Sequence, residues 1–118
     1  MHEASIAASL IDMLVELASE NRGRVVRARV RVGRLSGVVV ESLLFAFDVL
    51  KGEREETREA QLDIDEVPVV YRCRECGRTF EVGEIFWVEC PDCSGVDVEM
   101  VSGDELDLVD VEIDVGEV

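Results

Sequence analysis

The chain has 118 residues, of which 47% are hydrophobic and 33% charged, enough apolar material for one small folded domain. Its 27 acidic and 12 basic residues give a net charge of −15, a field that repels nucleic acid and anionic membranes, so neither is expected as a partner. No signal peptide and no apolar run long enough to cross a bilayer is visible. We therefore expect a cytoplasmic protein whose thiols stay reduced.

A helix and then a strand are predicted at the start of the chain. Residues 3–20 carry apolar side chains at helical spacing, and Asn-Arg-Gly at 21–23 is a stop signal. Residues 24–32 alternate between apolar and basic side chains, which predicts a half-buried strand whose arginines lie on a solvated face and pair with acidic residues. The side chains expected in the core are Val26, Ala28, Val30 and Val32, and those expected in solvent are Arg27, Arg29 and Arg31.

Four more elements are predicted further along the chain. Residues 40–51 have the pattern of a second amphipathic helix, and residues 60–66 that of a second strand. Residues 96–101 and 105–115 alternate like strands, the latter with Val109 and the alternate residues after it on the apolar side. This order predicts an α+β fold.

The fold is expected to have two parts. Two helices pack on a small mixed sheet in an α/β domain formed by residues 1–68 and 97–118. The segment 69–96 is inserted into it and holds all four cysteines, the only tryptophan and the only tyrosine of the chain.

The inserted segment has the cysteine spacing of a zinc ribbon. The two pairs, Cys73–Cys76 and Cys90–Cys93, each enclose two residues, and thirteen residues separate them. Such pairs form two tight turns that direct four thiolates at one Zn(II) ion, and four thiolates leave no place for water or substrate, so the zinc is expected to be structural. Disulfides, redox-active pairs and an iron–sulfur cluster are the alternatives for the same residues.

A zinc ribbon by itself does not assign a function. One hypothesis is an interaction module that bridges other proteins or nucleic-acid machinery, but residues 71–95 are net acidic, which speaks against nucleic acid. An enzyme is not expected, and no catalytic residue is assigned. The chain has no histidine besides His2, no open metal site and no glycine-rich phosphate loop.

The single histidine, His2, is placed where it can chelate a metal ion. Its imidazole, its own amide nitrogen and the amine of Met1 can close two fused rings around one ion, and the amide of Glu3 supplies a fourth nitrogen. Four nitrogens in a plane suit Ni(II) or Cu(II). The first amides of a helix have no intrahelical carbonyl partner, so such binding need not disrupt a helix that begins there.

Five features together resemble the HypA/HybF family of nickel metallochaperones. They are Met-His-Glu at 1–3, the amphipathic first helix, VGRLSGVVVESLLFAF at 32–47, the two cysteine pairs at 73–93 and SGDELDLVDVEID at 102–114. The resemblance covers nearly the whole chain in the same order.

The resemblance implies a nickel-binding α/β domain with a zinc domain. It implies Ni(II) as transported cargo on Met1, His2 and Glu3, and a structural Zn(II) on Cys73, Cys76, Cys90 and Cys93. The implied partners are a HypB-type GTPase and the large subunit of NiFe-hydrogenase, with a homodimer compatible with the family. Some relatives carry histidines beside the zinc cysteines or recruit a further nickel ligand. This chain has no such histidine, and Glu41 is a weak candidate for a further ligand because it is better suited to capping the second helix or facing solvent.

Overall fold

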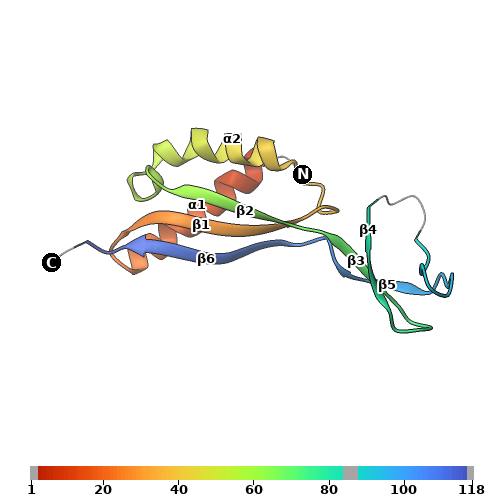
Figure 1. Ribbon diagram of the computed structural model, residues 1–118. Helices are drawn as coiled ribbons and strands as arrows, with labels where there is room; N and C mark the ends of the chain where they lie inside the picture. Colours follow the sequence, from red (N-terminus) through yellow and green to blue (C-terminus); the bar gives the residue numbers. More distant parts are fainter. Residues whose placement is uncertain (1–2, 84–87, 117–118) are drawn as a thin grey trace.

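The computed structural model describes residues 3–83 and 88–116, which form an elongated molecule with two small sheets (Figure 1). The first sheet has the order β2-β1-β6, with β1 parallel to β2 and antiparallel to β6. Two helices pack beside it, so the prediction of an α+β fold with two helices on a small mixed sheet is confirmed. Its elements are α1 (Glu3–Glu20), β1 (Arg24–Gly33), α2 (Val40–Leu50), two 3-10 turns (Lys51–Glu53 and Glu55–Thr57), β2 (Gln61–Val67) and β6 (Leu106–Asp114).

The core lies between the helices and one face of this sheet. Leu14 of α1 meets Leu43 and Phe47 of α2 there, and all three are fully buried. Burial of each such side chain contributes about 1.5–3 kcal/mol, so these contacts hold the helices on the sheet. The other buried apolar residues are Ala7, Leu10, Ile11, Val15, Ala18, Val25, Ala28, Val30, Val32 and Ala60.

The register of β1 differs from the predicted alternation at its start. Val25 is 2% exposed whereas Val26 is 40% exposed, so the prediction that Val26 faces the core is wrong. Val25 lies opposite Ile113 of β6, but Arg27 lies opposite Glu112, so the pairing shifts between them. A β-bulge inserts one unpaired residue and moves the preceding side chain to the other face.

A second shift occurs in β6. Arg29 lies opposite Asp110, but Val30 lies opposite Leu108, so Val109 is the extra residue. Val109 is 39% exposed and Leu108 is half-buried against the core. The prediction that Val109 is on the buried side is therefore wrong, and Leu108 takes that place.

The arginine row of β1 lies on the solvated face of the sheet, as predicted. Its neighbours on both sides are acidic: the side chain of Arg27 lies 3.2 Å from the carboxylate of Asp63 on β2, and Arg29 pairs with Asp110 on β6. Arg27 and Arg29 are thus each paired with a carboxylate of the protein itself at an exposed position.

The second sheet contains the cysteine segment. Its strand order is β4-β3-β5 and both pairings are antiparallel. The strand predicted at 96–101 is β5, which pairs with β3, while β3 and β4 were not predicted. The division of the chain into domains at 68/69 and 96/97 stays a prediction. The strands are β3 (Val69–Cys73), β4 (Thr79–Val82) and β5 (Val98–Ser102).

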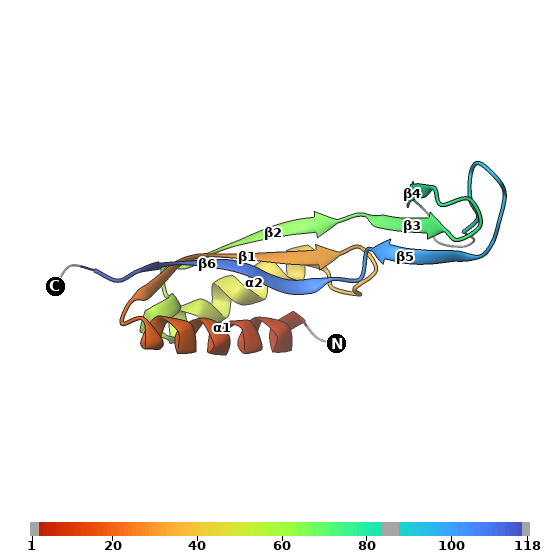
Figure 2. The same cartoon turned by 90° about the horizontal axis from the view of Figure 1, so that it is seen from below.

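The two sheets meet where backbones approach closely (Figure 2). The N–H of Leu35 donates to the carbonyl of Gly103 at 2.6 Å, and the N–H of Gly33 donates to the carbonyl of Glu105 at 2.7 Å. A Cβ on Gly33 would lie 2.2 Å from the carbonyl carbon of Gly103, so only glycine fits there. Among the described residues, no helix has the length and hydropathy needed to cross a membrane.

Candidate metal centre

The first cysteine pair lies in a tight turn at the end of β3. The N–H of Gly77 donates to the carbonyl of Cys73 at 2.8 Å, and the N–H of Cys73 donates to the carbonyl of Arg78 at 2.8 Å. Gly77 has a φ of 81°, which glycine adopts without a steric cost. The turn therefore brings Cys76 back beside Cys73.

The second pair lies in a turn with the same hydrogen bonds. The N–H of Ser94 donates to the carbonyl of Cys90 at 2.9 Å, and the N–H of Cys90 donates to the carbonyl of Gly95 at 2.9 Å. Ser94 takes the left-handed place that Gly77 holds in the first turn, with a φ of 61°. The two pairs are thus equivalent turns that face each other, and they present four sulfurs to one point.

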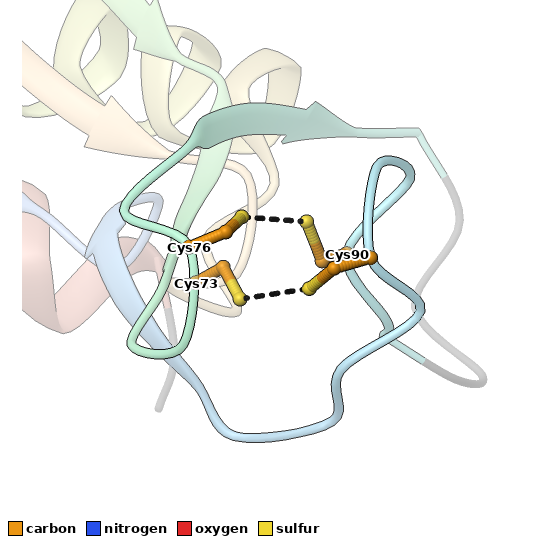
Figure 3. Close-up of side chains that lie close together, drawn as sticks. Cys73, Cys76 and Cys90 are labelled. Carbon is orange, nitrogen blue, oxygen red and sulfur yellow. Dashed lines mark hydrogen bonds between the residues drawn. The ribbon is translucent and has the colours of Figure 1, made fainter.

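The four sulfurs form a compact cluster (Figure 3). All lie within 4.8 Å of one another; Cys73 Sγ and Cys93 Sγ are 3.6 Å apart, and Cys76 Sγ and Cys90 Sγ are 3.5 Å apart. A disulfide would need about 2.05 Å, so all four cysteines are free. A tetrahedral ion with Zn–S bonds of about 2.3 Å would place neighbouring sulfurs about 3.8 Å apart. The cluster can hold one metal ion with little movement.

The thiols strongly influence one another. Backbone N–H groups, first that of Cys93, stabilise the Cys90 thiolate and lower the pKa of Cys90 to about 7. The N–H of Gly95 lowers the pKa of Cys93, but the Cys73 sulfur, burial and the other two sulfurs outweigh it and raise this pKa to about 12. The four sulfurs can therefore all become thiolates only if a cation bound among them neutralises their charge.

Charged side chains join the strands around the cluster. Arg72 bonds Glu99 across β3 and β5, and Arg74 lies 3.2 Å from Asp97 and 3.3 Å from Glu99. The two arginines, Arg72 first, lower the pKa of the Glu99 carboxyl. Arg78 pairs with Asp92, which joins the two cysteine turns. No pattern in the sequence marked these pairs, because they connect residues on different strands.

The other predicted site lies at the start of α1. Met1 and His2 lie outside the described residues, so only Glu3 can be placed. Its Oε2 accepts a hydrogen bond of 3.0 Å from the backbone N–H of Val39, which precedes α2. Glu41 is exposed in the first turn of α2. No pattern in the sequence indicated that Glu3 connects the starts of the two helices, because Val39 is 36 residues away.

A family model described as "Hydrogenase/urease nickel incorporation, metallochaperone, hypA" matches residues 1–113. The chain belongs to the HypA family. A hydrogenase maturation factor HypA from Syntrophus aciditrophicus is 38% identical over 116 residues, which are 97% of this chain and 100% of that protein. The HypA of Chlorobaculum parvum is 40% identical over 115 residues, with 97% and 100% of the two chains covered.

Solved HypA structures share the fold. The solution structure of the Ni metallochaperone HypA from Helicobacter pylori matches with a TM-score of 0.65 and 28% identity, over 96% of this chain and 97% of that one. A second HypA solution structure matches with a TM-score of 0.74 and 27% identity, covering 98% of each chain. The resemblance found in the sequence is therefore confirmed.

Proposed function

We propose that this chain binds Ni(II) at its N-terminus and delivers it for NiFe-hydrogenase maturation. The observation that carries the proposal is the family match, which begins at residue 1 and includes both the Met-His-Glu segment and the cysteine cluster. The matched relatives are named hydrogenase maturation factors, and one structural relative is titled a Ni metallochaperone. The protein is then a carrier and not an enzyme.

The nickel ligands in this proposal are the Met1 amine, the imidazole and amide of His2 and the amide of Glu3. Glu3 is the first described residue of α1, and the proposal is compatible with this position, because the first amides of a helix need no carbonyl partner within the helix. Four nitrogens in one plane match the preference of Ni(II).

The side chain of Glu3 has a different role in this proposal. Its carboxylate accepts the N–H of Val39, as the third residue of a helix does in a capping box, but from another helix. Val39 offers no side-chain cap of its own. The carboxylate therefore positions the N-terminal segment against α2, and its backbone nitrogen is the atom offered to nickel.

The cysteine cluster is proposed to hold a structural Zn(II) ion. Cys73, Cys76, Cys90 and Cys93 supply the complete tetrahedral shell, so the ion would have no open position for chemistry. When bound, zinc supplies charge neutralisation and a cross-link between the two turns. The residues themselves direct the sulfurs, through the paired turn hydrogen bonds.

The proposed partners and compartment follow from the family. A HypB-type GTPase and the hydrogenase large subunit are the proposed partners in nickel transfer, a homodimer is compatible with this role, and the cytoplasm is the proposed compartment. Neither nucleic acid nor a membrane is proposed as a partner, given the net charge of −15.

A nickel titration of the zinc-loaded protein tests the proposal. The wild type is expected to bind one equivalent with the visible band of square-planar Ni(II), and His2→Ala is expected to abolish it while zinc content stays unchanged. The control Glu41→Gln removes an exposed carboxylate in the first turn of α2 and is expected to bind like the wild type. If His2→Ala binds as well as the wild type, the nickel proposal fails and the hypothesis of a zinc-ribbon interaction module takes its place.

A further inference from the structure

Strand β6 is an exposed edge of the first sheet. It is the lower border of that sheet in Figure 1, and its described residues pair with β1 alone. It is nine residues long and contains no proline, lysine or arginine; its charged side chains are all acidic and disfavour pairing with another acidic strand, and its pairing with β1 shifts at Val109. Its outer backbone groups are therefore available to an added strand.

An apolar groove runs beside this edge. The groove has a volume of about 410 Å³ and lies between α1 and β6, with Ile6, Leu10 and Met13 on the helix side and Leu106 and Leu108 on the strand side. Met13 is 47% exposed and Leu106 is 38% exposed. Because side chains of a strand alternate between its two faces, every second residue of a strand added to β6 would point toward this groove.

The negative charge around the groove determines which kind of strand can bind there. Neither α1 nor β6 contains a lysine or arginine, and Asp107 lines the groove itself. A second copy of β6 would set acidic residues opposite acidic residues, which destabilises a strand pair. A segment with alternating basic and apolar residues would instead meet opposite charge and an apolar pocket. The acidic residues are Asp12, Glu16 and Glu20 on α1 and Asp107, Glu112 and Asp114 on β6, besides Glu3, which bonds Val39, and Asp110, which pairs with Arg29.

We propose that β6 binds an extended, positively charged segment of a partner protein as a fourth strand, with its apolar side chains in the groove between α1 and β6. This binding goes beyond nickel transfer and does not require nickel. Backbone hydrogen bonds to β6 supply affinity. The acidic residues of α1 and β6, together with the apolar groove, make the site selective for segments that alternate basic and apolar residues.

The test uses the full zinc-loaded protein and a short blocked peptide of alternating lysine and valine. Amide hydrogen exchange followed by NMR is expected to show new protection of β6 amides when the peptide is added, with β2 amides at the opposite edge unchanged. The same peptide with glutamate in place of lysine is expected not to bind. Binding of the lysine peptide is expected to weaken as salt is raised.

Two variants of equal charge separate a seated strand from general attraction to an acidic protein. Met13→Lys places a positive charge in the groove and is expected to raise the dissociation constant of the peptide at least about tenfold. Val49→Lys, at a residue on the outer side of α2 that is 58% exposed, adds the same charge elsewhere and is expected to change it less than about twofold. If Met13→Lys fails to fold, Leu106→Lys replaces it, because Leu106 lines the same groove.

Three outcomes would overturn the proposal. Equal weakening by Met13→Lys and Val49→Lys would show diffuse charge attraction only. Peptide binding without protection of β6 amides would place the site elsewhere. A homodimer detected by light scattering, whose β6 amides are protected without peptide, would show that the edge belongs to a second copy of this chain.

Discussion

The two sheets of this protein are held together by different forces. The sheet of β1, β2 and β6 has a helix layer and a continuous buried core. The sheet of β3, β4 and β5 and the turns beside it contribute only Val69, Cys73 and Cys90 to the buried apolar residues among those the structure describes. Ion pairs and the four-sulfur cluster connect its strands instead. The first sheet is thus stabilised by burial, and the second depends on cross-links.

This difference matters for a metal carrier. A region without a large core depends on its cross-links for its shape, so the proposed zinc ion would hold the strands of the second sheet in place, whereas the helix-backed region keeps its shape independently. Glu3, one of the proposed nickel-binding residues, belongs to the helix-backed region, because its carboxylate joins α1 to the start of α2. Loss of metal from the cluster should therefore leave the start of α1 in place.

The largest expected effect is on the cysteine region. Cys90→Ser removes one proposed zinc ligand. Because structural zinc supplies of the order of 10 kcal/mol or more to small zinc modules, β3, β4 and β5 are expected to lose exchange protection. The core of α1, α2 and β1 is expected to keep it. Residue-resolved hydrogen exchange and metal analysis provide the measurement. Val101→Ser, at an exposed position of β5, is the control, and simultaneous unfolding of both sheets would contradict the comparison.

The next effect is on the helix-backed core. Phe47→Ala removes a fully buried ring and is expected to lower the free energy of unfolding of that sheet by about 3–5 kcal/mol, without loss of bound metal. Phe45→Ala, two residues away and 72% exposed, is expected to cost less than about 0.5 kcal/mol. Chemical denaturation followed by circular dichroism measures both. Similar losses in the two variants would show that burial does not decide the stability of this region.

A smaller effect is expected at the junction of the sheets. Gly33→Ala forces the backbones of Gly33 and Gly103 apart and is expected to cost about 1–3 kcal/mol. Gly52→Ala is the matched control, because a Cβ there meets no atom within 4 Å. Thermal melting with both variants measures the difference. An unchanged melting temperature in Gly33→Ala would mean that the junction adjusts freely.

The smallest effect concerns the exposed ion pairs of the cysteine region. Arg72 and Arg74 lower the pKa of Glu99, so its carboxylate stabilises the folded form above the pKa of an unfolded glutamate, and this contribution is lost as the pH falls through the lower, folded pKa. Glu99→Gln is therefore expected to be slightly less stable than the wild type at neutral pH, and the difference should vanish in acid. Thermal melting of the wild type and the variant at each pH measures the difference in stability. A difference that is independent of pH would contradict an electrostatic origin.

The candidate sites were predictable to different degrees. The cysteine spacing predicted one metal cluster, and the structure brings all four sulfurs together as expected. Each cysteine turn is formed by residues close together in the sequence, so the spacing of the cysteines was enough to predict the cluster. The contact between Glu3 and Val39 could not be predicted, because it depends on how α1 and α2 pack.

The sequence by itself determined the helices, the strands of the first sheet, the cysteine cluster and the family, because apolar periodicity and ligand spacing act over a few neighbouring residues. Only the tertiary structure decided the strand register. Val26 and Val109 follow the alternating pattern, yet both lie at shifts in the pairing of β1 with β6, and β5 pairs with β3. Register and partner choice depend on strands far apart in the chain, and one bulge moves a side chain to the opposite face.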